Sequence, residues 1–326
     1  MSKPGDGLRD EPGQGGSSAH TMLGRSGRGM QAAGQITIRP VKDLTDFARV
    51  EALQGEVWQF AGTEIVPLHM LKAAATYGGL LLGAFDQSGE LLGFVFGFLG
   101  RQDGRLKHHS HMMGVLPACQ DASLGFRLKC AQRRAALEQG LDWATWTYDP
   151  LEGRNGYLNI GKLGAVCRTY LPNLYGELHD DLNSGLATDR FQVDWWLRTP
   201  RVEGRVGGKH RRLTLADVTA AGATHINQTW LSGGLRSPVD SDLTSRSIRV
   251  IVEIPGDFQQ VKQANMDAAR AWRAHTRELF ATTFGRGYAV TEFISELQAG
   301  ERRNFYLLER RTPADSSIAD PESHIP

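Results

Sequence analysis

The sequence predicts an α/β protein, because segments typical of strands alternate along the chain with segments typical of amphipathic helices. Strands at 79–85 and 91–99 are joined by a short polar turn, which predicts a hairpin. A third strand at 108–116 leads through a tight turn into a helix. In the second half, a strand at 247–254 precedes a long helix and two further strands. We therefore expect a mixed sheet flanked by helices.

The turn that follows the strand at 108–116 is the strongest candidate for a binding site. The helix after it has apolar residues at the spacing of one buried face, namely Leu124, Leu128, Ala131 and Ala135. The beginning of a helix carries unpaired N–H donors and a partial positive charge, so this turn can bind a phosphate group. An ordinary strand–helix turn is the alternative, because short turns that contain glycine are common.

This turn resembles the CoA pyrophosphate loop of the GNAT superfamily, the CoA-dependent N-acyltransferases, whose pattern is Q/R-x-x-G-x-G/A. Gln120 and Gly125 match the pattern, whereas Ser123 stands where the family has glycine. Serine adds a hydroxyl donor but demands ordinary backbone angles, whereas glycine lets the backbone approach a phosphate closely. The resemblance implies an acyl-CoA co-substrate, either acetyl-CoA or another acyl-CoA, and these binding residues: Val115, Leu116, Gln120, Ser123, Gly125 and Asn155.

The resemblance extends over about half of the chain. The segment 35–41 resembles the first GNAT strand, and 162–165 (KLGA) resembles a K-L-G-F motif of the family. It implies a GNAT-type mixed twisted sheet. The C-terminal lobe is either a diverged half-GNAT or an α+β cap. The expected division is a disordered Gly-rich tail (1–34), a GNAT acyltransferase-like domain (35–200), a linker (201–212), a C-terminal α/β lobe (213–310) and a frayed tail (311–326).

Composition limits the classes of partner. Lys plus Arg total 37 against 36 Asp plus Glu, a net charge of +1, which argues against nucleic-acid binding. The sequence contains no apolar run of membrane-spanning length, and its three cysteines are sparse and odd in number, which is typical of a reduced, cytoplasmic protein. We expect a small-molecule amine as the partner, no nucleic acid and no membrane, and a homodimer stays open.

Two histidines are the candidates for the base that removes a proton from the amine. His109 and His111 lie on one face of the strand, with His108 and Ser110 on the other. Imidazole serves as a base near neutral pH, and we favour His111 over His109 because it is closer to the expected splay of the strands. Structural histidines are the alternative. A metal site needs a third ligand, and the sequence offers no such cluster, so we expect no metal.

The acid that reprotonates the leaving thiolate is harder to identify. The family has a tyrosine four residues before the glycine of its L-G-F motif, and here that position is Ile160. Tyr175 is the catalytic candidate in its place, with Tyr170 and solvent as alternatives. Both tyrosines can instead be half-buried aromatic side chains whose hydroxyls face water. The resemblance also implies that Asn155 contacts the pantetheine arm, and a helix cap is the alternative.

Three arginines are candidates for the substrate side. Arg190 precedes the last strand of the first half, and its guanidinium can hold a carboxylate through two hydrogen bonds. The alternative for Arg190 is a surface ion pair with Asp189 or a glutamate. Arg273 and Arg277 share a face of the long C-terminal helix with Arg270, where a solvated basic face is the alternative. We interpret Asp149 as a turn residue before Pro150 rather than as a base.

These patterns together predict an enzyme, an acyl-CoA-dependent N-acyltransferase. It would move an acetyl or succinyl-type group to a primary amine of a small molecule such as an amino acid, by direct attack in a ternary complex. The alternative is a non-catalytic acyl-CoA sensor or interaction protein on a decayed GNAT scaffold, which Ser123 and Ile160 favour.

Overall fold

The structure is a computed structural model and describes residues 35–58, 64–176 and 184–310. The predicted tails at 1–34 and 311–326 therefore lie outside the described residues. Among the helices that the structure describes, none is long and apolar enough to cross a membrane.

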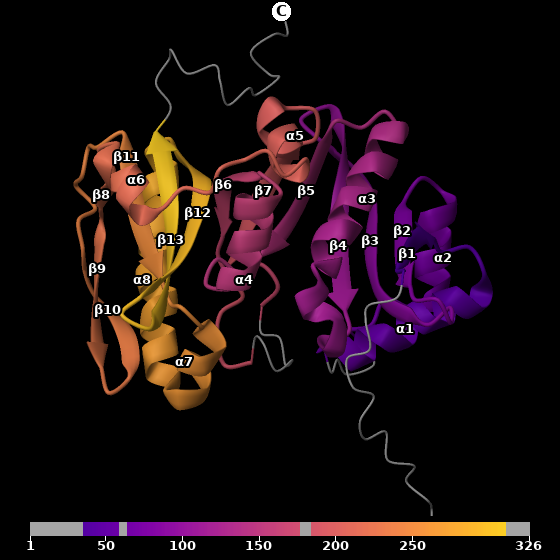
Figure 1. Ribbon diagram of the computed structural model, residues 1–326, viewed down its shortest axis with the longest axis horizontal. Coiled ribbons are helices and arrows are strands. Elements are labelled where there is room, and N and C mark those ends of the chain that lie inside the picture. Colours follow the sequence, from indigo (N-terminus) through magenta and orange to yellow (C-terminus); the bar gives the residue numbers. More distant parts are fainter. Residues whose placement is uncertain (1–34, 59–63, 177–183, 311–326) are drawn as a thin grey trace, which may run out of the picture. The chain divides into compact units, whose positions relative to one another are not determined.

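The first half follows the predicted order of strands and helices (Figure 1). Its elements are β1 (Thr37–Pro40), α1 (Leu44–Trp58), α2 (Leu68–Thr76), β2 (Leu80–Phe85), β3 (Leu91–Gln102), β4 (Arg105–Val115), the 3-10 helix η1 (Pro117–Ala122), α3 (Leu124–Glu138), β5 (Trp143–Tyr148), α4 (Gly153–Gly156), the π-helix η2 (Tyr157–Lys162), β6 (Val166–Leu171), β7 (Arg190–Trp196) and α5 (Pro200–Val206).

The second half adds the remaining helices and strands. They are α6 (Leu215–Ala220), β8 (Thr224–His225), β9 (Asn227–Ser232), β10 (Leu235–Ser241), β11 (Arg249–Ile254), α7 (Phe258–Ala264), α8 (Met266–Gly285), β12 (Tyr288–Gln298) and β13 (Glu301–Arg310).

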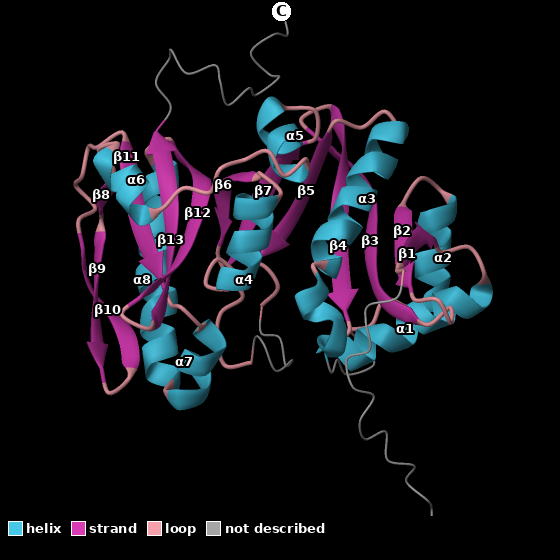
Figure 2. Ribbon diagram, viewed as in Figure 1, coloured by secondary structure: helices cyan, strands magenta, loops and turns pink. Residues whose placement is uncertain are grey.

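One mixed sheet runs through both halves, which confirms the predicted fold class for the described residues (Figure 2). Its order is β1-β2-β3-β4-β5-β7-β6-β12-β13-β11-β8, and β9 pairs with β10 separately. Most neighbours are antiparallel, but β4 and β5 are parallel, as are β8 and β11. The two halves meet where β6 pairs with β12 through Cys167 and Val290.

Alternation along the strands divides the core of the first half between the two faces of the sheet. Leu81 packs in one cluster with Phe47 and Val50 of α1, whereas Leu82 packs in another with Leu124 and Leu128 of α3. Helices α1 and α2 therefore cover one face of β2 and β3, and α3 covers the other. We call these the α1 face and the α3 face.

One expectation for the second half needs correction. The single long helix expected after the strand at 247–254 is two helices, because Asn265 leaves the helical conformation and its Oδ1 accepts from the N–H groups of Asp267 and Ala268, capping α8.

The predicted linker at 201–212 begins as helix α5, and Thr199 caps it by accepting from Val202 N–H. Arg205 within it is buried and forms an ion pair with Glu292 of β12 at 2.5 Å. An exposed linker is therefore wrong for the first part of this segment. The division of the chain into two domains stays a prediction.

Candidate active site

Strands β4 and β5 are neighbours in the sheet but separate along most of their length. They pair only at His108 with Ala144 and at His109 with Thr145. Beyond those pairs β4 continues to Val115 and β5 to Tyr148. The backbone edges of the two strands are thus unpaired with each other over this stretch, which we call the β4–β5 gap. An extended ligand arm could pair with these edges as a missing strand would.

The ladder between β3 and β4 decides which N–H groups point into the gap. The N–H of Leu116 points toward β3 and donates to the carbonyl oxygen of Leu92 at 3.0 Å. This N–H is therefore not available to a ligand in the gap. The predicted role of Leu116 is therefore wrong. Because successive residues of an antiparallel strand point to opposite sides, Val115 N–H faces the gap, and so does that of Met113.

The beginning of α3 opens on the same gap. A Cβ on Gly125 would lie 3.3 Å from Met113 Cε on β4 and 3.9 Å from Leu158 Cδ2 on η2. Glycine therefore suits a position where β4, α3 and η2 converge. The first N–H groups of α3 have no partner within the helix, so they remain available to a phosphate here.

Ser123, at the helix start, adopts a conformation that the sequence analysis did not expect. Its φ of 55° and ψ of 21° are left-handed, the region that glycine adopts at no steric cost. The prediction that serine holds ordinary backbone angles here is wrong: the backbone follows the glycine-like path and serine bears the strain. Gln120 beside it accepts a hydrogen bond from Arg154 at 3.2 Å, which brings a positive charge to the loop.

A β-bulge in β4 determines the positions of the candidate bases. Gly97 pairs with Ser110 and Phe96 with Met112, so His111 is the extra residue. His109 and His111 both contact the Phe98 ring, with centroids 5.3 and 5.8 Å away, on the α1 face. The prediction that they share a face is confirmed.

Both imidazoles on this face are in a state that can accept a proton. Burial, with Lys107 and His111 adding to it, lowers the pKa of His109 to about 4, and burial also lowers the pKa of His111. His109 Nδ1 lies 3.2 Å from Thr145 Oγ1 on β5. Both rings are therefore neutral near pH 7.

Tyr175 lies on the same face of β5 as this histidine pair. Its hydroxyl is 2.9 Å from Thr147 Oγ1, and Thr147 is two residues from Thr145 on β5. The guanidinium of Arg190 lies 5.6 Å from the Tyr175 ring centroid. Tyr170 is different, because its hydroxyl donates to Asp189 at 2.6 Å, and burial with that bond raises its pKa.

The α3 face of the gap holds a polar cluster that the sequence analysis missed. Lys129 of α3 is 3% exposed, and its Nζ donates to Ser110 Oγ at 2.7 Å and Gln132 Oε1 at 3.2 Å. The same Nζ lies 3.7 Å from the Trp146 ring centroid. Burial lowers the pKa of Lys129 to about 7. The apolar spacing of this helix gave no signal that Lys129 faces inward, because its partners Ser110 and Trp146 lie on neighbouring strands.

Two of the candidate substrate arginines are held by carboxylates of the chain itself. Arg273 is buried and bound by both oxygens of Asp149, and Arg277 is bound by both oxygens of Asp189 at 2.8 and 2.6 Å. A solvated basic face is therefore wrong for Arg273. Arg190 lies 3.7 Å from Asp149.

The same carboxylate of Asp149 accepts from Leu151 N–H at 2.9 Å. The turn role of Asp149 is therefore confirmed, and the paired arginines add a second task to it. We call the side chains of Asp149, Asp189, Arg190, Arg273 and Arg277 the strand-end network.

The remaining candidates are less central. Asn155 is exposed on α4 and is not its cap, because the cap position is Glu152. Ile160 is fully buried in the cluster that also contains Trp146. Burial raises the pKa of Cys119, which favours a structural thiol. Among the described residues, no group of three His, Cys, Asp or Glu side chains is arranged to hold a metal ion.

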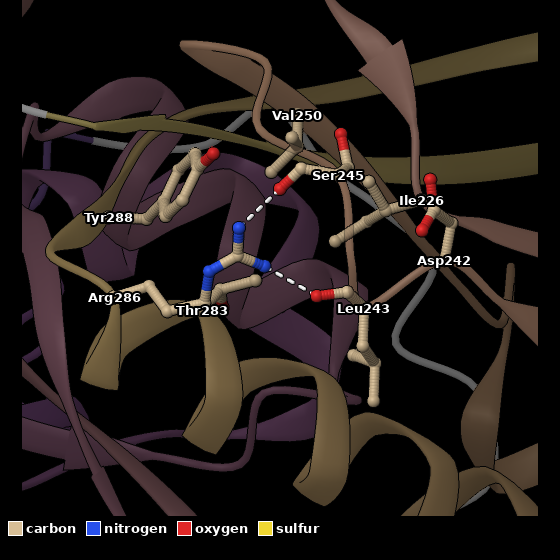
Figure 3. A pocket seen from close by; sticks show the side chains of 8 residues that line it. All are labelled: Ile226, Asp242, Leu243, Ser245, Val250, Thr283, Arg286 and Tyr288. Carbon is tan, nitrogen blue, oxygen red and sulfur yellow. Dashed lines mark hydrogen bonds between the residues drawn. The ribbon is translucent and has the colours of Figure 1, made fainter.

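A small hollow beside α8 is closed by its own side chains. Figure 3 shows the Arg286 guanidinium donating to the carbonyl oxygens of Leu243 and Ser245, both at 2.5 Å. Tyr288 next to it donates to Ser247 O. These bonds fix the segment before β11.

No family model and no curated protein matches the chain. Three solved structures to which it is similar are acetyltransferases. A putative GNAT acetyltransferase from Desulfovibrio desulfuricans has 13% identity and a TM-score of 0.39, with 50% of this chain and 99% of that chain covered. A GNAT acetyltransferase from Streptococcus pneumoniae has 16% identity and a TM-score of 0.41, with 49% and 98% covered.

A putative acetyltransferase from Salmonella typhimurium, solved with acetyl-CoA, has 19% identity and a TM-score of 0.41, with 50% and 95% covered. The first two of these structures are described as members of the GNAT family, which is the family that the sequence resembles.

Proposed function

We propose that this protein is an acyl-CoA-dependent N-acyltransferase. The observation that supports this most is that α3 begins at the β4–β5 gap, with Gly125 between Met113 and Leu158. This arrangement puts helix N–H donors for a diphosphate beside unpaired strand edges for an extended amide-bearing arm.

The chain's own groups fit CoA in their chemistry. The N–H groups of Met113 and Val115 would pair with the pantetheine arm, and the backbone at Ser123 and Gly125 would hold the pyrophosphate. Gln120, with Arg154 bound to it, adds donors and positive charge at the same end. Asn155 stays a proposed contact on the neighbouring helix. When bound, acyl-CoA supplies the thioester whose carbonyl is attacked.

The α1 face of the gap would receive the amine. An ammonium cannot attack a carbonyl, so a base must remove its proton. His111, in the bulge just beyond the last paired residues, is our first choice, and His109 is the second. Tyr175, the candidate acid from the sequence, borders the same side as these bases, and Arg190 beside it would hold a carboxylate of the acceptor. Arg273 and Arg277 would act through the carboxylates of Asp149 and Asp189 that they hold.

The transferred group is proposed to be acetyl or succinyl, and the acceptor a primary amine of a small molecule such as an amino acid. The test is release of free CoA thiol from acetyl-CoA and from succinyl-CoA, measured against a panel of amino acids and other primary amines. Release that depends on the amine supports the proposal. Binding of acyl-CoA without release with any amine would support a non-catalytic acyl-CoA sensor instead.

A further inference from the structure

Lys129 lies where the two strands of the gap begin to separate. Ser110 is the first residue of β4 beyond the paired section, and Trp146 is the first residue of β5 beyond it. Lys129 Nζ contacts both, the hydroxyl at 2.7 Å and the ring centroid at 3.7 Å. This amine therefore lies at the closed end of the gap, on the α3 face.

The surroundings of Lys129 offer it hydrogen bonds but no negative charge. Its partners among the described residues are a hydroxyl, an amide oxygen and an indole ring. Two titratable groups couple to it, His108 and His109 of β4, and burial keeps both neutral, with pKa values of about 3 and about 4. In the part of the chain that the structure describes, no carboxylate binds Lys129, so the group can give up and regain a proton near neutral pH.

The hydrogen bonds of the cluster also fix the direction in which protons can move. Gln132 accepts from Lys129 with its oxygen and therefore turns its amide nitrogen to His108 Nε2, at 2.9 Å. That ring nitrogen is then an acceptor, by assignment from these bonds. Ser110 accepts from Lys129, so the hydroxyl hydrogen of Ser110 is left to donate elsewhere.

The proposed reaction also needs a proton for the leaving thiolate. The position at which the family resemblance implies an acid is Ile160, which has no proton to give and is buried in the same cluster as Trp146. Tyr175 lies on the α1 face with the proposed bases. An acid on the face opposite the base would keep the two groups from exchanging their proton directly.

We propose that Lys129 is the proton source for the leaving CoA thiolate and that the Ser110 hydroxyl relays the proton. This rests on the proposed function. As the amine nitrogen bonds to the acyl carbon, the C–S bond breaks and its electron pair goes to sulfur. Ser110 gives its hydroxyl proton to that sulfur and takes one from Lys129 Nζ. Lys129 is left as a neutral amine and regains a proton from solvent.

The test compares thiol release by the wild type with release by Lys129→Met, Lys129→Arg and Ser110→Ala, across pH. We expect Lys129→Met to lower kcat by about 10- to 100-fold with an unchanged KM for acyl-CoA. In the wild type kcat/KM should fall above about pH 7, where Lys129 loses its proton, and this fall should be absent from Lys129→Met. Arg134→Met, an exposed cation of the same helix, is the matched control.

Each outcome decides the question. Lys129→Arg should stay slow, because a guanidinium keeps its proton at neutral pH, and full rescue by arginine would overturn the relay in favour of charge alone. Ser110→Ala should slow release to a similar extent, and it serves as the test if Lys129→Met does not fold. Unchanged kcat in the folded variants would overturn the relay but leave the proposed function standing. No thiol release by the wild type would overturn both.

Discussion

The β4–β5 gap and the strand-end network both contain a buried cationic side chain, Lys129 in the gap and Arg273 in the network, but the two cations have different partners. In the strand-end network Arg273 is held by Asp149 and Arg277 by Asp189, each through two hydrogen bonds. In the gap Lys129 has a hydroxyl, an amide and a ring as partners. A buried cation paired with a carboxylate has a fixed charge and serves the architecture. One without such a partner can change its protonation state and so take part in chemistry.

The largest expected effect concerns the arginine–carboxylate pairs of the strand-end network. Arg273→Met removes the buried cation that binds both oxygens of Asp149 and leaves Arg190, 3.7 Å away, as the remaining cation beside that carboxylate. It should lower the free energy of unfolding by about 3 kcal/mol, measured by urea denaturation. Arg270→Met is the control, because Arg270 is exposed and its pair with Asp267 should contribute less than about 0.5 kcal/mol. If Arg273→Met kept its stability and raised the KM for the amine instead, Arg273 would belong to the substrate site.

The next effect concerns the base on the α1 face of the gap. His111→Ala should lower kcat by about 100-fold, because the base that deprotonates the amine is gone, while calorimetry shows an unchanged CoA affinity. His225→Ala, on the exposed strand β8, is the matched control. Unaltered turnover in His111→Ala would eliminate His111, and the same measurement on His109→Ala would then decide between the two imidazoles.

A third prediction concerns Lys129 in the gap and the way in which its burial makes the stability of the protein depend on pH. The pKa of Lys129 falls from 10.5 to about 7 on folding, so between these values the unfolded chain holds a proton that the folded chain has lost. Stability should therefore rise with pH in this window, by up to about 1.4 kcal/mol per pH unit from this group. Subtracting the curve of Lys129→Met isolates the contribution. A difference between the two curves that does not change from pH 7 to 10 would show that Lys129 is not buried as described.

The smallest effect tests the strain at the beginning of α3. Ser123→Gly removes a side chain from a left-handed residue and should stabilise the protein by about 0.5–1 kcal/mol, with CoA bound at least as tightly. Ala299→Gly, at φ 50° in the turn between β12 and β13, should give a similar gain in stability without any change in CoA affinity. A loss of stability in Ser123→Gly would contradict the left-handed assignment.

Local spacing in the sequence was enough to predict most elements of the first half. The hairpin of β2 and β3, the strand–turn–helix around Gly125 and the shared face of His109 and His111 all follow from patterns within a few residues. Features that depend on partners far along the chain were not accessible. The bulge at His111 arises from pairing with β3, and Leu116 N–H is engaged by Leu92 across the same ladder.

The burial of charged residues was likewise not predictable from the sequence. From sequence alone, a lysine or an arginine on a helix is expected to be solvated. Lys129 instead contacts Trp146, and Arg273 binds Asp149. Both contacts depend on the tertiary fold. The break at Asn265 is a different case, because an asparagine followed by Met-Asp is an N-cap signal that the sequence did offer.

The central claim is that the beginning of α3 binds the diphosphate of CoA, and calorimetric titration with CoASH tests it most directly. The wild type should bind CoASH with a Kd below about 1 mM, whereas Gly125→Glu places a carboxylate at the helix start and should weaken binding by about 100-fold or more. Gly204→Glu in α5, where a side chain meets nothing within 4 Å, should bind as the wild type does. Absence of binding by the wild type near 1 mM, or equal binding by Gly125→Glu, would contradict the claim.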